Sequence, residues 1–447
     1  MTRITLPSAQ NGEVLPEHYY RNFGAGLIHG VFFQASAAFS NIHTVLPSLV
    51  AMLTPAASAV GLMASLQAIG AVIPQLSTAY LIDGRQRKKP WLMAIIITRF
   101  LALGLLAWLI FQFGVSRPGL VLFALIGLFG LFSLIGGMGT VIYADIFARA
   151  IPARRRGRFA GSKQLFGFGL AILAGLVVKW ILDQPERFPF ATNYALIIAL
   201  SAAVLAVALI GFALIKEPQG KNQRLLTSPR DLLRTSGQLF KGSNNLRMLL
   251  LNRSLLTLSL ALAPFFVVYA HNDLNVAASV IGLYLALQMV GAASSNILWA
   301  WLSDSYGNRL VIVGVGLTFA LAAGLAWLTP SHMSWLFGGV FLLLGATLSG
   351  VQVGYSNIIL EMADESTRPV CVALQNTALA PLAFAPLLVG FLAAWWSYPT
   401  LFAIAGILAL ASLLVAIMFL REPRYDPTAR CCVAASPETS DAEKCEP

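Results

Sequence analysis

Twelve apolar segments, each long enough to cross a lipid bilayer, divide this chain of 447 residues. A helix needs about 20 mostly apolar residues to cross the hydrocarbon core. Charged residues make up only 11% of the chain, whereas soluble domains carry about 25%. The sequence therefore predicts an all-α integral membrane protein with twelve transmembrane helices. We place the spans near 24–52, 57–82, 90–113, 118–147, 160–182, 191–215, 248–270, 277–302, 309–328, 333–360, 369–396 and 398–420.

Lysine and arginine gather in alternate loops. They are frequent between the second and third spans, between the fourth and fifth, and through 216–247, whereas the opposite loops hold only Arg117, Lys179 and Arg187. Cytoplasmic loops carry the excess of positive charge, so both termini are predicted to be cytoplasmic. We expect a multi-pass protein of the cell membrane, with a bacterial inner membrane as its setting. The net charge of +11 fits this topogenic role, and no nucleic-acid partner is expected.

The longest internal connection, residues 216–247, separates two sets of six spans. The predicted units are a cytoplasmic tail over 1–22, a six-helix bundle over 23–215, a cytoplasmic linker over 216–247, a second six-helix bundle over 248–420 and a cytoplasmic tail over 421–447. In the linker, Leu232, Leu233 and Phe240 lie among basic residues. That pattern favours a short helix at the membrane surface, and a solvated linker is the alternative.

A polar and basic pattern follows the second span and occurs again after the eighth. The first copy is Leu81-Ile82-Asp83 with Arg87 and Lys88, and the second is Leu302-Ser303-Asp304 with Gly307 and Arg309. The ends of the fourth and tenth spans also correspond, with Asp145 before Arg156 and Asn357 before Arg368. Equivalent loops in the two halves indicate an internal repeat, which is typical of transporter folds.

The loop after the second span resembles the signature of the major facilitator superfamily, roughly Gly-x-Leu-x-Asp-Arg-x-Gly-Arg-Lys. The chain keeps Leu81, Asp83, Arg87 and Lys88 of that pattern and departs from it at Ala79, Gly84 and Gln86. Arg156-Gly157-Arg158 is similar to the family's loop between spans four and five. The resemblance extends from about residue 20 to residue 420. It implies two pseudo-symmetric six-helix bundles around a central cavity, working by alternating access.

The repeated loops are interpreted as a cytoplasmic gate. A carboxylate at a helix end can pair with arginine and accept hydrogen bonds from the N-terminal N–H groups of a neighbouring helix. If such contacts form only when the bundles close on the cytoplasmic side, they bias a two-state equilibrium. The alternative is that the basic residues are only topogenic. The predicted gate residues are Asp83, Arg87, Lys88, Asp145, Arg156, Asp304 and Arg309.

Polar side chains inside the spans are candidates for solute or proton binding. Arg99 lies nine residues after Pro90, about 14 Å into its span. Its expected partner is Gln67 or Gln75 on the second span, and an anionic solute is the alternative. Arg253 is expected to snorkel from the cytoplasmic end of its span. The candidate set, in which His29 is the residue that can carry a proton, is His29, Gln34, Asn41, Arg99, Asn252, Gln288 and Gln352.

The function predicted from these features is secondary-active or facilitative transport of a small organic solute across the cell membrane. A transporter-like scaffold, receptor or assembly factor without transport activity is the alternative. No paired carboxylates, metal-ligand cluster or nucleophile–base pattern points to an enzyme, and no loop resembles a nucleotide site. We expect no cofactor and no metal, and the partners are expected to be the solute and the lipid bilayer, with the protein as a monomer.

Overall fold

The computed structural model describes residues 17–82, 85–218, 229–364 and 368–429, and every element in these ranges is helical. The first half comprises α1 (Tyr19–Phe39), α2 (Val45–Leu53), α3 (Ala57–Ile82), α4 (Lys89–Phe113), α5 (Pro118–Ala150), α6 (Ala153–Leu182) and α7 (Thr192–Ala213). The connection after it contains α8 (Pro229–Gly242), which confirms a short helix at the position where the sequence predicts one.

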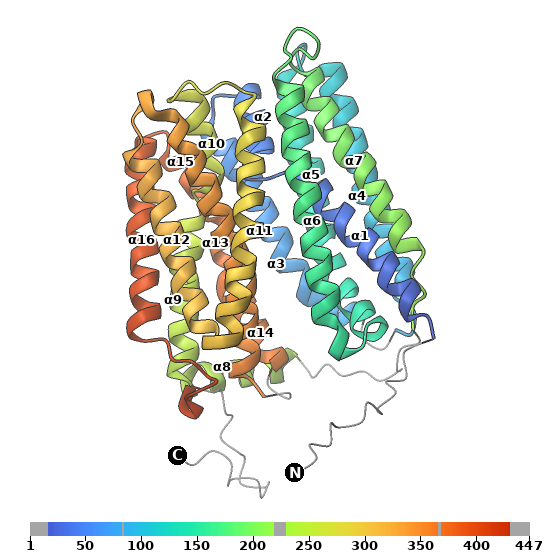
Figure 1. Cartoon of the computed structure of the whole chain (residues 1–447), viewed down its shortest axis with the longest axis vertical. Helices are drawn as coiled ribbons and strands as arrows, with labels where there is room; N and C mark the ends of the chain where they lie inside the picture. Colours follow the sequence, from blue (N-terminus) through green and yellow to red (C-terminus); the bar gives the residue numbers. More distant parts are fainter. Residues whose placement is uncertain (1–16, 83–84, 219–228, 365–367, 430–447) are drawn as a thin grey trace, which may run out of the picture.

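The second half repeats this arrangement, as Figure 1 shows. Its helices are α9 (Asn244–Leu260), α10 (Ala263–Asn272), α11 (Val280–Tyr306), α12 (Asn308–Leu328), α13 (Gly338–Met362), α14 (Arg368–Leu379), α15 (Ala385–Leu392) and α16 (Tyr398–Met418). Short 3-10 segments, η1 (Ser331–Phe337), η2 (Ala380–Phe384) and η3 (Pro427–Ala429), precede α13, join α14 to α15 and follow α16. The two halves form adjacent bundles, which confirms the predicted all-α fold of twelve spans in two six-helix bundles.

Eleven helical segments among the described residues are long and apolar enough to cross a membrane. The remaining span is α1 together with α2, which the sequence treats as one helix over 24–52. The chain breaks between them because the Asn41 carboxamide accepts from His43 N at 2.8 Å and from Thr44 Oγ1 at 3.1 Å. These bonds give the backbone an alternative to helix. Two spans after the linker are also divided, one between α9 and α10 and the other between α14 and α15.

Within each bundle, helices approach closely where one of them presents glycine. A Cβ on Gly137 of α5 would overlap the carbonyl oxygen of Gly70 on α3. In the second bundle, Gly345 of α13 lies equally close to the Gln288 carbonyl of α11. Lipid is as apolar as leucine, so membrane helices associate through such close packing rather than by escape from water. The glycines thus determine which helix faces pair.

The closest backbone contacts between the bundles lie toward one end of the molecule, and side-chain bonds also cross the interface between Gln164 and Asn296 and between Gln75 and Asn376. We call the end where α1 begins and α16 ends the terminal end, and the other the opposite end. Gly61 on α3 packs against Pro386 and Leu387 of α15, and Gly175 on α6 packs against Ala286 of α11. Both contacts lie in the half of the molecule nearer the opposite end. Leu387 N also donates to Ser65 Oγ across the interface at 3.0 Å.

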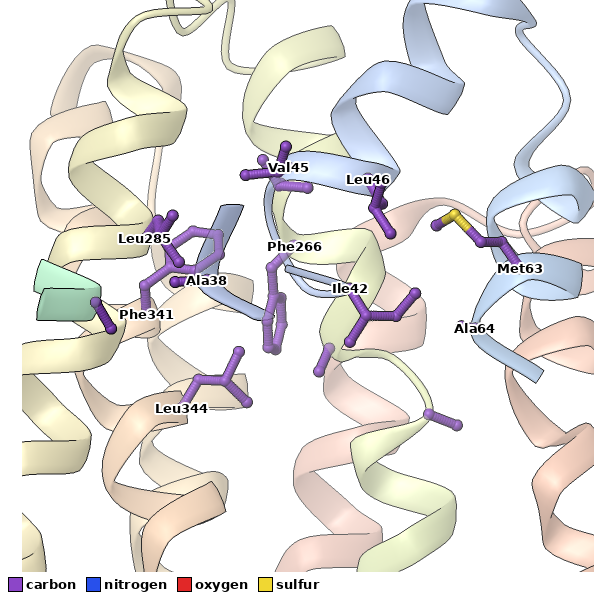
Figure 2. Close-up of a cluster of buried hydrophobic side chains, with 14 of the residues drawn as sticks. Ala38, Ile42, Val45, Leu46, Met63, Ala64, Phe266, Leu285, Phe341 and Leu344 are labelled. Carbon is purple, nitrogen blue, oxygen red and sulfur yellow. The ribbon is translucent and has the colours of Figure 1, made fainter. Parts of the chain in front are cut away.

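An apolar cluster fills the space between the bundles near that opposite end (Figure 2). Val45 and Leu46 of α2 are fully buried there, together with Phe266 of α10 and Leu285 of α11. Met63 of α3 joins them from the first bundle and is also fully buried. Aromatic and branched side chains from both halves therefore seal this end of the molecule.

Candidate functional site

A central cavity lies between the bundles and is lined by both of them. Its volume is about 190 Å³, and its lining includes Gln34 and Asn41 from the first half with Gln288 and Gln352 from the second. Gln34 fits because Gly167 of α6 has no side chain, since a Cβ there would overlap the Gln34 carboxamide. Four predicted candidates therefore share one cavity. Gln288 is 1% exposed and its Oε1 has no partner among the described residues.

A larger pocket of about 410 Å³ adjoins the central cavity and shares Gln34, Ala37 and Gln352 with it. We call it the Arg99 pocket, after the guanidinium that α4 supplies. Its other polar lining residues include His29, Tyr143 and Lys163. Ala37 is exposed to this space. The two cavities form a connected polar region at the middle of the spans.

Arg99 reaches the pocket by crossing the face of α5. A Cβ on Gly136 would stand 3.1 Å from Arg99 Cζ, so the missing side chain makes room for the guanidinium. Arg99 Cζ lies 3.8 Å from the ring centroid of Phe132 and 5.1 Å from that of Phe33. Its Nε is buried and has no hydrogen-bond partner among the described residues. An arginine at the centre of a membrane helix costs about 2.5–3.5 kcal/mol, and ring contacts offset part of that.

The expected bond from Arg99 to Gln67 or Gln75 is not present. Gln75 Nε2 donates to the Ala71 carbonyl, and Gln75 Oε1 accepts from Asn376 across the bundle interface at 3.4 Å. Gln67 Oε1 is buried without a partner among the described residues. The structural partner predicted for Arg99 is therefore wrong. Gln67 and Gln75 nevertheless line a small pocket together with Arg99, Phe33 and Phe132.

Lys163 of α6 is a cation of this pocket that the sequence analysis did not single out. It stands at the fourth residue of the span predicted over 160–182, where a lysine fits the membrane interface. The helix, however, begins at Ala153, so Lys163 lies ten residues, about 15 Å, along it. Its chain passes over Gly30 of α1, where a Cβ would overlap Lys163 Cδ. Its Nζ lies 5.8 Å from the ring centroid of Tyr143. The residue at which the helix begins was the information needed to place Lys163 at this depth.

His29 lies at the pocket wall with one ring nitrogen engaged. Its Nδ1 is 2.9 Å from the carbonyl oxygen of Ala208 on α7. That carbonyl can only accept, so Nδ1 carries the proton and Nε2 of the neutral ring is an acceptor. The imidazole also packs among the rings of Phe33, Tyr143 and Phe212. The proton-binding role of His29 stays a prediction.

Asn252 has a different place from the other candidates. It is fully buried, and its Nδ2 donates to the carbonyl and hydroxyl oxygens of Ser412 at 2.6 and 2.9 Å. Its Oδ1 accepts from Tyr355 Oη at 2.5 Å. With all these bonds made between α9, α13 and α16, Asn252 joins three helices and lines none of the cavities described here.

Arg253 does not snorkel to the helix end. Its Cζ lies 4.3 Å from the Tyr355 ring centroid, and its Nε and Nη1 are buried without hydrogen-bond partners among the described residues. It lines a third cavity of about 320 Å³ together with His43 and Gln67. The expectation was wrong because α9 begins at Asn244, which places Arg253 further inside the span than the apolar run suggested.

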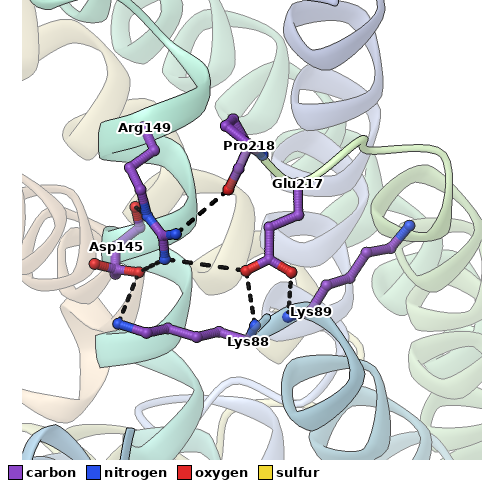
Figure 3. Close-up of polar contacts among 6 residues, drawn as sticks. All are labelled: Lys88, Lys89, Asp145, Arg149, Glu217 and Pro218. Atoms are coloured by element: carbon purple, nitrogen blue, oxygen red, sulfur yellow. Dashed lines mark hydrogen bonds and ion pairs between the residues drawn. The ribbon is translucent and has the colours of Figure 1, made fainter. Parts of the chain in front are cut away.

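The predicted gate residues at the terminal end make contacts within one bundle (Figure 3). Lys88 Nζ lies 3.1 Å from Asp145 Oδ2, and Arg149 pairs with the same carboxylate. Glu217, which follows α7, accepts from Lys88 N at 2.7 Å and from Lys89 N at 3.0 Å. A carboxylate there stabilises the start of α4 because it meets unpaired N–H groups and the positive end of the helix dipole.

The second half repeats this arrangement with different residues. Glu422 accepts from Arg309 N at 2.7 Å at the start of α12. Burial raises the pKa of Glu422. The hydrogen bond from the Arg309 N–H acts on this pKa in the opposite direction, because it favours the charged carboxylate. Arg424 binds Glu361 at 2.6 Å and the Asp304 carbonyl at 3.0 Å. The carboxylates at these helix starts are thus Glu217 and Glu422, which the sequence analysis did not single out.

Two asparagines complete the repeat. Asn22 Nδ2 donates to the Lys216 carbonyl at 2.9 Å and Asn22 Oδ1 accepts from Lys216 N at 2.8 Å. Asn245 makes the same pair with the carbonyl and N–H of Arg421, at 3.1 and 2.9 Å. The sequence signal was available, since Lys216-Glu217-Pro218 and Arg421-Glu422-Pro423 follow the last span of each half.

The structure gives different information on each of the remaining predicted gate residues. Asp83 lies outside the described residues. The Asp304 and Arg87 side chains are exposed, and no ion pair of Asp304 with Arg309 is recorded among the described residues. Arg156 donates to the carbonyls of Ala148 and Ile151, at 2.5 and 3.1 Å, and so caps the end of α5. A role of these residues in gating stays a prediction.

Comparison with known proteins finds a family match in the second half of the chain. A family model described as Major Facilitator Superfamily matches residues 249–430. The multi-drug resistance efflux pump PmrA of Streptococcus pneumoniae is 25% identical over 197 residues, covering 42% of this chain and 47% of the pump. The chain thus matches about half the length of this curated relative.

Solved structures match over nearly the whole chain. A variant of the nucleoside transporter NupG has a TM-score of 0.69 at 13% identity, covering 90% of this chain and all of that one (100%). An inward-facing bacterial homologue of the iron transporter ferroportin has a TM-score of 0.66 at 16% identity, covering 89% and 98%. At such identities the likeness shows the fold.

Proposed function

We propose that the chain is a transporter of the Major Facilitator Superfamily, whose model matches residues 249–430, and that it moves a small organic solute across the cell membrane by alternating access. The observation that carries the proposal is the central cavity. It is lined by spans of both bundles, with Gln34 on α1 facing the same space as Gln288 on α11 and Gln352 on α13. A solute bound there would contact both halves, so their relative movement would change the end from which it can leave.

The distribution of contacts supports an inward-facing conformation. The close glycine contacts between the bundles and the apolar cluster of Figure 2 lie near the opposite end. The ion pairs at the terminal end hold residues of one bundle together, as Asp145 with Lys88 does. If the terminal end faces the cytoplasm, as the lysine and arginine distribution predicts, the closer packing lies on the outer side of the cavity. On its cytoplasmic side the interface is crossed by a side-chain bond, from Asn296 Nδ2 to Gln164 Oε1 at 2.8 Å. The transporter-like scaffold without transport remains the second interpretation.

A labelling experiment separates a transporter from a static scaffold. Ala37 lines both the central cavity and the Arg99 pocket. In a background without the native cysteines, Ala37→Cys is exposed to an impermeant maleimide from one membrane face at a time. Alternating access predicts reaction from both faces, faster from the cytoplasm, because closed and open states exchange. Reaction from a single face would support the scaffold.

The control for this experiment is Gln184→Cys, in the loop between α6 and α7 at the opposite end. It should react only with external reagent if the predicted orientation is correct. Cytoplasmic reaction of Gln184→Cys would reverse the orientation and leave the question of alternation to Ala37→Cys. The two variants therefore report orientation and transport behaviour independently.

A further inference from the structure

The cavities of this protein carry an unbalanced charge. Arg99 and Lys163 line the Arg99 pocket, and Arg253 lines the cavity beside it. None of the described residues that line these pockets or the central cavity is an aspartate or glutamate. Cations inside a membrane protein are usually paired with carboxylates or with backbone carbonyls. A charged pocket of one sign, in a low-dielectric setting, attracts ligands of the other sign.

No described residue neutralises either cation of the Arg99 pocket. Among the residues that the structure describes, Arg99 and Lys163 have no ion pair and no hydrogen bond, and the contacts recorded for them are with aromatic rings. Ring faces attract a cation but leave its N–H groups without acceptors. Arg99 Nε is buried in that condition. The donors that carboxylates or carbonyls would normally bind are therefore available to a ligand.

The fold makes room for both cations. Gly30 leaves the path that the Lys163 chain follows, and Gly136 leaves the space in which the Arg99 guanidinium lies. These glycines belong to α1 and α5, and Lys163 belongs to α6, so three helices of the first bundle besides α4 shape the pocket. An arginine that only needed to be hidden would not need a pocket of about 410 Å³ beside it. This volume is within the usual range of ligand pockets, about 300–1,000 Å³.

The remaining walls select the body of the ligand. Phe33 and Tyr143 present ring faces beside the two cations, and Leu92 and Ile95 add apolar surface from α4. Flat apolar groups stack on such rings. The fork of a guanidinium matches the two oxygens of a carboxylate, whereas an ammonium acts as a point charge beside it.

We propose that the Arg99 pocket binds the carboxylate of an organic anion with a flat, apolar body, and that such an anion is the transported solute. Arg99 would hold the carboxylate through paired N–H bonds, Lys163 would add the second positive charge, and the rings would take the body. This inference rests on the proposed function, because it assigns the solute of that transport a chemical class.

Matched pairs of ligands test the charge requirement. The probes are benzoate with benzamide, phenylacetate with phenylacetamide, and indole-3-acetate with indole-3-acetamide, titrated calorimetrically onto the purified full-length protein in lipid nanodiscs. In at least one pair the acid should bind ten times more tightly than its amide. Lys163→Gln should weaken binding of that acid about tenfold and leave the amide unchanged. Lys163→Arg, which keeps the charge, should retain most of the affinity.

The matched control is Lys179→Gln on the same helix. Lys179 lies outside the pocket and pairs with Asp183 at 3.0 Å, so this change should leave binding of every probe intact. The inference would be overturned if acids and amides behaved alike in all three pairs, including a failure of all to bind. A loss of acid binding in Lys179→Gln equal to that in Lys163→Gln would overturn it as well.

A second measurement needs no ligand. Ala37→Cys should react faster with a negatively charged methanethiosulfonate than with a positively charged one, relative to the same ratio at Gln184→Cys. Lys163→Gln should lower that ratio severalfold, and an unchanged or inverted ratio counts against the pocket's charge. If Ala37→Cys reacts from both faces but the protein takes up only neutral solutes, the anion inference would fall and the transport proposal would stand. If acids bind but Ala37→Cys reacts from one face only, the anion inference would stand and the transport proposal would fall.

Discussion

At the scale of single residues, Asn22 and Asn245 are the sharpest example of a side chain whose role depends on distant backbone. They are 2% and 5% exposed, and each satisfies the N–H and the carbonyl of one residue that follows the last span of its bundle. The next residue, Glu217 or Glu422, then meets the start of α4 or α12. Each asparagine therefore positions the carboxylate that follows.

We expect Asn22→Ala to cost about 1–3 kcal/mol, because it leaves the part-buried N–H and carbonyl of Lys216 without their side-chain partner. The melting temperature of the purified protein should fall. Asn245→Ala should cause at least as large a fall, because Asn245 makes the corresponding bonds to Arg421 and also donates to the Ala429 carbonyl at 3.1 Å. Asn193→Ala is the matched control, since Asn193 Oδ1 accepts only the local Tyr194 N–H, at 2.7 Å. Equal melting temperatures for Asn22→Ala and Asn193→Ala would contradict this account.

At the scale of helices, the contact of α6 with α11 decides how the opposite end closes. A Cβ on Gly175 would lie 2.7 Å from Ala286 N, and one on Gly282 would overlap the backbone at Lys179. The helices thus touch backbone to backbone, as small residues permit in membranes. An added methyl group must push them apart, and the cost falls on the conformation in which they touch.

We therefore expect Gly175→Ala to shift the population toward the state that is open at the opposite end. External labelling of Ala37→Cys should become faster, and cytoplasmic labelling slower. Gly169→Ala is the control on the same helix, because a Cβ at Gly169 meets nothing within 4 Å and alanine favours helix over glycine by about 1 kcal/mol. Unchanged labelling in Gly175→Ala, or an equal change in Gly169→Ala, would refute the idea that the added methyl group pushes α6 and α11 apart.

At the scale of the whole molecule, the closest backbone contacts between the two bundles lie toward the opposite end, and a covalent link there should hold them. Ser65 on α3 and Leu387 on α15 meet through a hydrogen bond of 3.0 Å from Leu387 N to Ser65 Oγ. Oxidising the pair Ser65→Cys and Leu387→Cys should therefore abolish external labelling of Ala37→Cys. Cytoplasmic labelling should persist, and reduction should restore both.

The single variants, treated with the same oxidant, control for side reactions. The cross-link is verified by mass spectrometry. External labelling that continued in the cross-linked protein would mean that access to the cavity does not pass through the contact of α3 with α15. In that case the closed end described here would not be the outer gate.

The sequence alone determined the membrane class and the twelve spans, because a bilayer requires long apolar helices wherever the chain crosses it. The internal repeat and the resemblance to the family followed from loops whose residues are neighbours in the chain, as in Leu302-Ser303-Asp304. It also identified Arg99 as a residue in need of a partner, since desolvation of a guanidinium depends mainly on depth.

The tertiary structure alone decided what that partner is and which residues join it. Lys163, Tyr143 and His29 reach the Arg99 pocket from three other helices, and single-sequence periodicity does not show which helix faces meet. The break at Asn41 and the start of α9 follow from local hydrogen bonds, the second from the Ser243 cap, which compete with the apolar pattern. The helix α6 begins at Ala153, before the apolar run, without a side-chain cap. Depth along a helix follows from its start, and partners follow from packing, so only the folded chain reveals a pocket with two cations and no carboxylate among its described lining residues.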